Sequence, residues 1–206
     1  MTYSAIILSG GESQRFGQDK GLFKVFQKPL ISYVIKKVEP FVDELLIVTK
    51  RKSANGYSSL FPSTRILVDE YPWRGALAGI ATGLQHARGT YSYVLPSDTP
   101  LLSPQVLALL RDSSNEHEAV IPRWPSGYLE PLQAIYHTRA TARAASLSIQ
   151  EEIFRLRNMI SHLNDVKYIS TVTLAQYDPK LRTFFNINQV DDLHEIRHLL
   201  ALERRV

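Results

Sequence analysis

Residues 4–20 read SAIILSGGESQRFGQDK, and this stretch carries the strongest indication of the fold. It begins with an apolar, β-rich segment, Ser4–Leu8, and continues directly into a loop with three glycines, a hydroxyl, an arginine and a lysine. Glycine lets the backbone adopt positive φ and approach a ligand closely. Backbone N–H groups and fixed cations neutralise phosphate oxygens. A buried strand followed by such a loop predicts a phosphate-binding site at the end of that strand.

The spacing within this loop differs from that of the two common phosphate loops. A Walker A loop has the form G-x-x-x-x-G-K-[ST], whereas Gly11 and Gly17 are six apart and Lys20 comes three residues after Gly17. The dinucleotide fingerprint G-x-G-x-x-G is absent because Gly10 and Gly11 are adjacent. A dehydrogenase of the usual dinucleotide-binding kind is therefore disfavoured.

Strand-like and helical segments alternate along the first half of the chain. The predicted strands are Ser4–Leu8, Glu44–Thr49, Arg65–Val68, Tyr91–Leu95 and Ala119–Ile121, and the predicted helices are Pro29–Val38, Gly75–Arg88 and one that runs from an N-cap at Ser103 through Leu110. Repeated β-α-β units with nearly continuous apolar strands predict a mostly parallel sheet with helices on both faces. Right-handed crossovers then give a Rossmann-like three-layer α/β/α sandwich.

The loops of interest all follow predicted strands. They are residues 10–20, 69–75 and 96–100. Ligands of such sheets bind beyond the carboxyl ends of the strands, so these loops are expected to surround one site.

The second half of the chain has a less regular pattern. Predicted strands are Leu132–Tyr136, Val166–Thr171 and Phe184–Ile187, and predicted helices are Ser148–Leu163 and Val190–Leu200. No internal repeat, low-complexity tract or linker interrupts the 206 residues, so one domain over 1–206 is predicted.

The composition is that of an ordinary globular protein, with 44% hydrophobic and 21% charged residues and a net charge of +4. The basic residues are scattered, which disfavours a nucleic-acid partner. The absence of cysteine excludes disulfides and cysteine-ligated metals. No apolar run approaches the roughly 18 residues of a membrane helix. The N-terminus has no basic region before its first strand, so a cytoplasmic location without membrane association is expected.

Asp98 lies in the sequence PSDTP directly after a predicted strand. A hard carboxylate at that edge suits Mg²⁺, which takes one or two protein carboxylates together with phosphates and water. The alternative is an aspartate that organises its own loop in an Asx-turn.

Asn186 and Asn188 flank Ile187 near the C-terminus. Their amide oxygens are candidate metal or phosphate-water ligands, and the alternative for Asn188 is an N-cap for the last helix. His194 and His198 are four apart but fall off the apolar stripe of that helix, so an exposed pair is expected rather than a metal site.

Four motifs resemble the molybdenum cofactor guanylyltransferase family of the nucleotidyltransferase superfamily. They are the loop L-S-G-G-x-S-x-R-F-G-x-D-K, the strand end V-L-x-x-D-x-P around Asp98, the strand P-L-x-A-x-Y after Glu130, and the closing N-I-N-x-x-x-D-L. Two departures occur: Ala76 replaces the proline of the family's G-P-L-A-G-I, and Ser97 and Thr99 replace the cysteine and methionine that often flank the aspartate. The resemblance covers nearly the whole chain and implies a sheet of the nucleotide-diphospho-sugar transferase type.

The resemblance implies that GMP passes from Mg²⁺–GTP to the phosphate of molybdopterin, with or without molybdenum, and that pyrophosphate leaves. Catalytic roles fall to Lys20, Arg15 and Asp98, and metal ligation to Asp98 and Asn188. The implied nucleotide-binding residues are Leu8, Ser9, Gly10, Gly11, Ser13, Lys20, Asp69, Gly75 and Asp98, and the implied acceptor-binding residues are Glu130, Pro131, Asn186 and Asn188.

Further expectations concern the two halves of the domain and the partners. Residues of about 1–112 would bind the nucleotide and about 113–206 the acceptor, with Trp124 or Tyr128 as candidates to stack on a pterin. A monomer or weak oligomer is expected, with at most transient contact with enzymes that deliver or receive the cofactor.

Two alternatives remain open at this point. One is a related nucleotidyltransferase that uses CTP or UTP or a different phosphorylated acceptor. The other is a regulatory protein that binds nucleotide and has lost catalysis. The presence of both Asp98 and Lys20 in the sequence argues against this second alternative.

Overall fold

The computed structural model describes residues 1–10, 19–69, 75–189 and 192–203. Its main sheet has seven strands in the order β5-β4-β1-β6-β8-β7-β9. The strands are β1 Tyr3–Ser9, β4 Glu44–Thr49, β5 Arg65–Val68, β6 Tyr91–Pro96, β7 Ala119–Arg123, β8 Ala134–His137 and β9 Val166–Ser170. Within this sheet β8 is antiparallel to both of its neighbours, and the other pairings are parallel. The predicted mostly parallel sheet is thereby confirmed.

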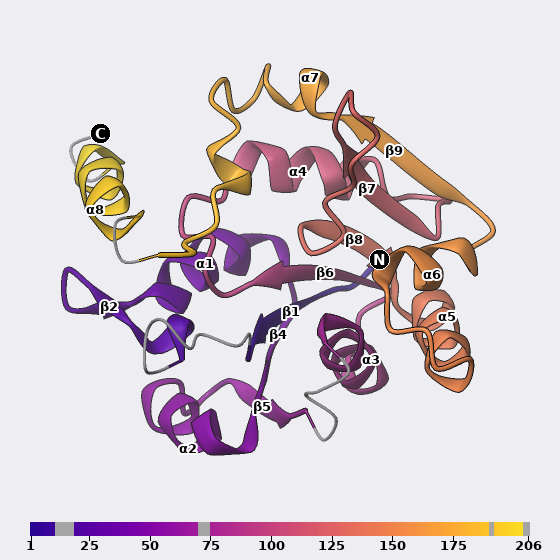
Figure 1. Cartoon of the computed structure of the whole chain (residues 1–206), viewed down its shortest axis with the longest axis horizontal. Helices are drawn as coiled ribbons and strands as arrows, with labels where there is room; N and C mark the ends of the chain where they lie inside the picture. The colour runs from indigo at the N-terminus through magenta and orange to yellow at the C-terminus, as the bar shows by residue number, and fades with distance from the viewer. Residues whose placement is uncertain (11–18, 70–74, 190–191, 204–206) are drawn as a thin grey trace.

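Helices cover both faces of the sheet (Figure 1). The α-helices are α1 Leu30–Val38, α2 Arg51–Leu60, α3 Ala76–His86, α4 Pro104–Asp112, α5 Thr138–Gln150, α6 Leu156–Ser161, α7 Thr171–Leu174 and α8 Asp192–Glu203. Short 3₁₀ turns are η1 Lys20–Leu22, η2 Glu39–Phe41 and η4 Arg182–Phe184. Helices α3, α5 and α6 pack on one face, while α1 and α4 pack on the other (Figure 1).

The alternation of side chains along the central strands explains this layering. In β1, Ala5 and Ile7 belong to the apolar cluster beneath α1 and α4, while Ile6 belongs to the cluster beneath α3 and α5. All three side chains are fully buried. Successive residues of a strand point to opposite faces, so a central strand with helices on both sides is apolar throughout.

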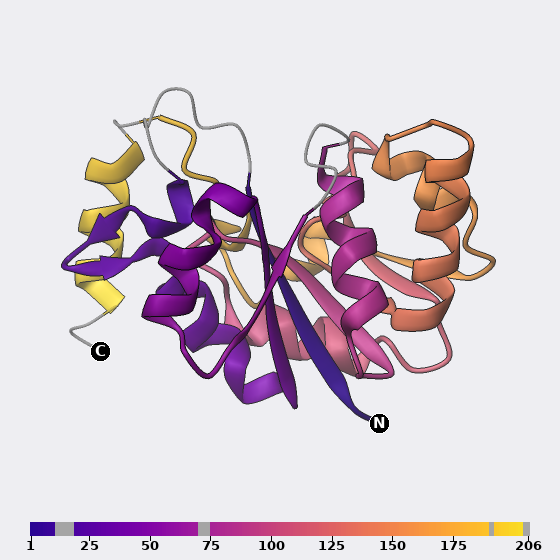
Figure 2. The same cartoon turned by 90° about the horizontal axis from the view of Figure 1, so that it is seen from below.

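A third apolar cluster lies beyond one end of the sheet. It joins the small hairpin of β2 Lys24–Val25 and β3 Lys28–Pro29 to the start of α1 and to α8, and it contains Ile187. The C-terminal helix therefore lies beside the N-terminal hairpin, as Figures 1 and 2 both show. This arrangement brings residues from the two ends of the chain to the same edge of the molecule.

The prediction of one helix over Ser148–Leu163 is wrong. The chain forms α5 and α6 instead, and Glu152 between them has a left-handed backbone with φ of 57°. The first ten residues of α5 escaped prediction because its buried face consists of small side chains, among them Ala140, Ala144 and Ala145. Small residues give a weak hydrophobic signal even where they pack closely.

The predicted strand Phe184–Ile187 is also wrong. Arg182–Phe184 forms η4, and the residues after it have no regular structure. The apolar side chains of the predicted strand pack into two different clusters instead of entering the sheet, because Phe184 contacts the cluster of α1 and α4 and Ile187 belongs to the third cluster. Helix α2 and the β2–β3 hairpin were not predicted, because α2 buries only Ser53 and Tyr57 and the hairpin strands have two residues each.

The parallel strands place their carboxyl ends at one edge of the sheet. In Figure 2 the N-terminus of β1 lies at the bottom and its carboxyl end at the top, on the side of the hairpin and the start of α8. The described ends of the predicted loops lie at this edge: Gly10, Asp19, Lys20, Asp69, Gly75 and residues 96–98.

Candidate functional site

A cavity of about 540 Å³ opens at the carboxyl ends of β1, β4, β5 and β6. Its walls come from these strand ends, from η1 and from the first turns of α3. The lining residues are Leu8, Ser9, Gly10, Asp19, Lys20, Val48, Thr49, Lys50, Asp69, Gly75, Ala76, Gly79, Pro96, Ser97, Asp98 and Leu132. A pocket of this size, in the range of cofactor and substrate sites, accommodates a nucleotide.

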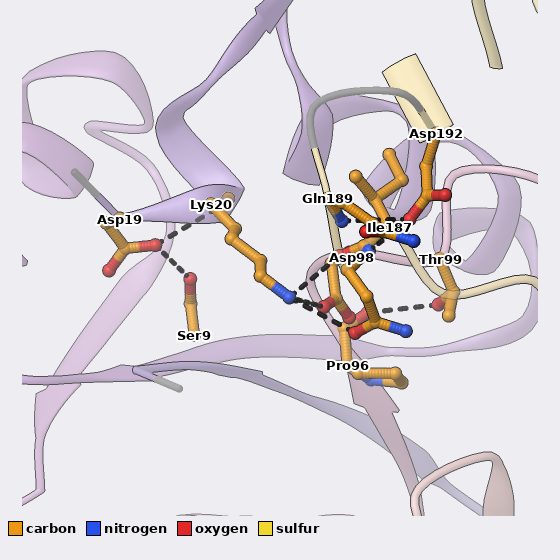
Figure 3. Close-up of polar contacts among 11 residues, drawn as sticks. Ser9, Asp19, Lys20, Pro96, Asp98, Thr99, Ile187, Gln189 and Asp192 are labelled. Atoms are coloured by element: carbon orange, nitrogen blue, oxygen red, sulfur yellow. Dashed lines mark hydrogen bonds and ion pairs between the residues drawn. The ribbon is translucent and has the colours of Figure 1, made fainter. Parts of the chain in front are cut away.

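Lys20 joins three separate parts of the chain at one point of this cavity (Figure 3). Its Nζ donates to the Oδ2 of Asp98 at 3.2 Å, to the carbonyl oxygen of Ile187 at 2.7 Å and to the Oδ1 of Asn188 at 3.4 Å. The predicted loop, the predicted strand end and the closing N-I-N segment therefore converge, although 167 residues separate Lys20 from Ile187.

Asp98 is enclosed by the same contacts. Its side chain is 20% exposed, and burial raises the pKa of its carboxyl, while the ammonium of Lys20 opposes this rise. The backbone of its loop is fixed by a bond from the Ile187 N–H to the Asp98 carbonyl at 3.1 Å and by the Thr99 hydroxyl, which donates to the Pro96 carbonyl at 3.2 Å. The largely enclosed carboxylate of Asp98 thus faces the ammonium of Lys20.

The segment that carries the two asparagines is fixed by the burial of Ile187 and by hydrogen bonds to Asp192. Ile187 is fully buried in the third cluster, while Asn186 and Asn188 on either side of it are exposed. The Asp192 carboxylate accepts the N–H of Asn188 at 2.6 Å and the N–H of Gln189 at 2.9 Å. The carboxylate that binds the backbone before α8 is thus that of Asp192, and the Oδ1 of Asn188 contacts Lys20 instead.

The oxygen donors at this point fit a hard divalent cation. Asp98 Oδ2 and Asn188 Oδ1 both lie within 3.4 Å of the same Lys20 nitrogen, so one carboxylate and one amide oxygen are close together. No group of three or more His, Asp or Glu side chains able to hold a metal occurs among the described residues. One carboxylate with phosphate and water is the usual environment of Mg²⁺ in nucleotide enzymes.

The structure describes most, but not all, of the predicted nucleotide-binding and catalytic residues. Leu8, Ser9, Gly10, Lys20, Asp69, Gly75 and Asp98 all line the cavity. Gly75, with φ of 69° directly before α3, has the left-handed backbone that favours glycine. Gly11, Ser13 and Arg15 lie outside the described residues.

The predicted acceptor side lies on the segment between β7 and β8. The indole N–H of Trp124 donates to the Glu130 carboxylate at 2.7 Å, and burial raises the pKa of Glu130 while this bond lowers it. The Trp124 ring packs on Phe184 with centroids 5.7 Å apart, whereas Tyr128 is 64% exposed. The Pro131 carbonyl accepts the hydroxyl of Tyr136, and Leu132 reaches the cavity wall.

Several lining residues were not predicted. Thr49 is the last residue of β4 and Lys50 follows it, as Asp69 follows β5, so the rule that ligands bind at the carboxyl ends of strands could have found them. Tyr57 of α2, which contacts Ser9 and Asp19, carries no signal in the sequence, because its helix has no motif. His194 and His198 are both exposed on α8, as predicted.

Comparison with known proteins identifies the family of the chain. The family model of the MobA-like NTP transferase domain matches residues 5–166. The chain belongs to this family. Its members are nucleotidyltransferases, enzymes that generally use a divalent metal.

Relatives with similar sequences extend over nearly the whole chain. A probable molybdenum cofactor guanylyltransferase from Methanosarcina mazei is 29% identical over 94% of this chain and 89% of its own length. Another of that name from Chloroflexus aggregans is 32% identical over 98% and 96%. The crystal structure of molybdopterin-guanine dinucleotide biosynthesis protein A from Archaeoglobus fulgidus superposes with a TM-score of 0.80 at 29% identity, over 96% of this chain and 98% of that one.

Within the described residues, every helix is too short or too polar to cross a bilayer.

Proposed function

We propose that this member of the MobA-like NTP transferase family transfers GMP from GTP to the phosphate of molybdopterin and releases pyrophosphate. The observation that carries the proposal is the Lys20–Asp98 pair, which lies with the Asn188 amide at the edge of a nucleotide-sized cavity. Relatives that cover the chain almost completely are named as molybdenum cofactor guanylyltransferases, which supports GTP and molybdopterin as the substrates.

The nucleotide would occupy the cavity with its phosphates toward Lys20. The ammonium of Lys20 neutralises charge on the α-phosphate as the bond to pyrophosphate breaks. Arg15, which lies outside the described residues, is proposed to bind the leaving pyrophosphate in a bidentate manner. The attacking phosphate is already ionised near neutral pH, so the chain needs no general base for this step.

We infer that the metal is Mg²⁺ and that Asp98 and Asn188 would hold it. When bound, Mg²⁺ supplies positive charge to the phosphates. Asp98 is suited to this role because its largely enclosed carboxylate lies beside the cavity and has the ammonium of Lys20 as a partner, which opposes the rise of its pKa on burial. Lys20 and the metal would share the charge of the phosphates, and the two asparagines would keep the C-terminal segment next to them.

Selection of guanine would fall to Asp69. Its carboxylate lines the cavity at the end of β5, and a Cβ built on Gly79 would lie 3.8 Å from its Oδ2, so this oxygen lies near the first turns of α3. Two carboxylate oxygens can accept the paired N1–H and N2–H of guanine, a pattern that cytosine and uracil lack.

The acceptor would approach from the side of Glu130 and Pro131, across from the strand ends that hold the nucleotide. Leu132, which follows them, lines the same cavity, so an acceptor bound there would reach the phosphates. In this proposal residues of about 1–112 bind the nucleotide and about 113–206 the acceptor, with Asn186 and Asn188 between the two substrates. Action as a monomer or weak oligomer in the cytoplasm, with transient contact with cofactor-delivery or acceptor enzymes, remains our prediction.

A pyrophosphate-release assay tests the proposal. The purified protein is incubated with Mg²⁺, molybdopterin and one nucleotide at a time: GTP, CTP, UTP or ATP. The released pyrophosphate is measured, and the dinucleotide product is identified by its mass. Of the four nucleotides, we expect only GTP to yield pyrophosphate, and only when molybdopterin is present. Release with CTP or UTP would assign the protein to a sister reaction, and nucleotide binding without any release would make it a binding protein.

A further inference from the structure

A second polar network lies directly behind Lys20, on the side away from Asp98 (Figure 3). The Oδ1 of Asp19 accepts the Ser9 hydroxyl at 2.9 Å, the Tyr57 hydroxyl at 2.7 Å and the N–H of Gly21 at 3.0 Å. The hydroxyls of Ser9 and Tyr57 also contact each other. One carboxylate oxygen is thereby fixed from β1, from α2 and from η1.

This network determines where the backbone of Lys20 lies. Asp19 is the N-cap of η1, and Lys20 is the first residue of that single turn. The cap is completed by the bond from the Gly21 N–H to the Asp19 side chain, so the carboxylate sets the start of the turn. The Lys20 side chain then extends from a fixed point to Asp98 and to the Ile187 carbonyl.

Packing around Gly21 shows how close the parts of this network lie. A Cβ built on Gly21 would contact the Tyr57 hydroxyl, would lie 2.6 Å from the Ser9 Oγ and would lie 3.0 Å from the Ser97 Oγ. Tyr57 is fully buried, and Ser9 is 1% exposed. Glycine at this position therefore allows η1 to lie directly against the two hydroxyls.

We propose that Tyr57, Ser9 and Asp19 form a positioning network that holds Lys20 in register with Asp98. None of the three needs to touch the reacting phosphorus, because they act through the backbone of Lys20. A fixed origin keeps the long lysine side chain within reach of a phosphate, and displacement of a catalytic group by about 1 Å can cost about 100-fold in rate. The catalytic part of this inference rests on the proposed function.

Tyr57 is the best probe, because the chain contains a matched control. Tyr93 is also fully buried, belongs to the same apolar cluster and donates its hydroxyl to the Leu107 carbonyl at 2.7 Å, a bond that joins β6 to α4. Tyr57→Phe and Tyr93→Phe each remove one buried hydroxyl and its hydrogen bond. Only Tyr57→Phe removes a contact to the residue that caps η1.

The first measurement compares steady-state kinetics and melting temperature for the two variants. We expect similar melting temperatures, a kcat about 10- to 100-fold lower for Tyr57→Phe and a KM for GTP within about threefold of the wild type. Tyr93→Phe should retain the wild-type kcat. Equal kcat values for Tyr57→Phe and an active wild type would overturn the proposal.

The second measurement needs no substrate. In protein with ¹³C-labelled lysine, the Lys20 side-chain signal is assigned by its absence from Lys20→Arg. We expect this signal to shift or broaden in Tyr57→Phe and to stay in place in Tyr93→Phe. An unchanged signal in Tyr57→Phe overturns the positioning network regardless of kinetics. A wild type that transfers no GMP overturns the proposed function instead, and the NMR comparison still decides the network.

Discussion

Lys20 is the residue at which the two halves of the sequence meet, because its single ammonium donates to Asp98, Ile187 and Asn188. We predict that Lys20→Ala lowers kcat by about 100- to 1,000-fold, since removal of one fixed donor at a developing charge has this effect in other enzymes. Pyrophosphate release under saturating GTP measures it. The melting temperature should stay close to that of the wild type.

Lys28→Ala is the matched control for this prediction. Lys28 is an exposed lysine of the nearby β2–β3 hairpin, so its loss changes the net charge by the same amount outside the cavity. Near-normal turnover of Lys20→Ala would contradict the prediction, because the fixed ammonium would then not be needed. An equal loss in Lys28→Ala would show that general surface charge, and not the fixed ammonium, matters.

At the scale of the element, helix α3 offers two glycines with different surroundings. A Cβ on Gly83 would collide with the side chain of Ile6, which is fully buried in β1, whereas a Cβ on Gly79 would lie 3.3 Å from a terminal methyl of Leu8 at the cavity wall. We predict that Gly83→Ala destabilises the protein by about 1–3 kcal/mol, because the helix must move off the sheet.

Gly79→Ala should change the free energy of unfolding by less than about 1 kcal/mol, because Leu8 can yield and alanine favours the helix. Urea denaturation of both variants checks the order. A larger loss for Gly79→Ala than for Gly83→Ala would contradict the packing described here.

Glu44 joins the amino-terminal ends of β1, β4 and β5, at the edge of the sheet opposite the cavity. Its carboxylate accepts the Ser4 hydroxyl at 2.9 Å and the Arg88 N–H at 2.8 Å, and it pairs with Arg65. Burial alone would raise the pKa of Glu44, but these partners together hold the pKa below its ordinary value of 4.5. The folded protein therefore favours the ionised form.

The sign of the pH dependence follows from that depressed pKa. The stabilisation by Glu44 is complete above about pH 4.5 and is lost as the pH falls through the lower pKa of the folded state. We predict that Glu44→Gln costs about 1–3 kcal/mol at neutral pH and that the difference shrinks on acidification. Denaturation at several pH values, with exposed Glu39→Gln as the control, measures this. A pH-independent difference would contradict the prediction.

At the scale of the whole molecule, ligand binding should couple distant segments. The site is built from β1, η1, β6 and the segment before α8, so a nucleotide bound there contacts both ends of the chain. We predict that GTP with Mg²⁺ raises the melting temperature, because a ligand that binds only the folded state stabilises it by about 2.7 kcal/mol at 100 times its Kd.

The same rise should be much smaller in Asp98→Asn, which keeps the shape of the side chain but lacks its charge. A thermal-shift series with GTP alone, Mg²⁺ alone and both together checks the prediction. An equal rise in Asp98→Asn and wild type would remove Asp98 from metal binding. A rise with CTP instead of GTP would leave the site in place and change the base.

Much of this architecture was predictable because periodicity is a local property. The apolar runs of β1, β4, β5 and β6 match the structure to within one residue at most ends, and Ser103 caps α4 as expected. Helix α5 and the residues after η4 were misassigned because their packing uses alanines in one case and a separate apolar cluster in the other. No local pattern distinguishes such a cluster from a strand.

The sequence by itself determined the alternation of strands and helices, the glycine-rich loop after β1 and the residue types at the strand ends, since each depends on neighbours in the chain. Only the tertiary structure decided that Lys20 contacts Asp98 and Ile187, and that Tyr57 and Ser9 fix Asp19 behind it. The physical reason is that such contacts join residues from 10 to 167 positions apart in the chain. Packing of the sheet, α2 and α8 sets those distances, and no spacing along the chain encodes them.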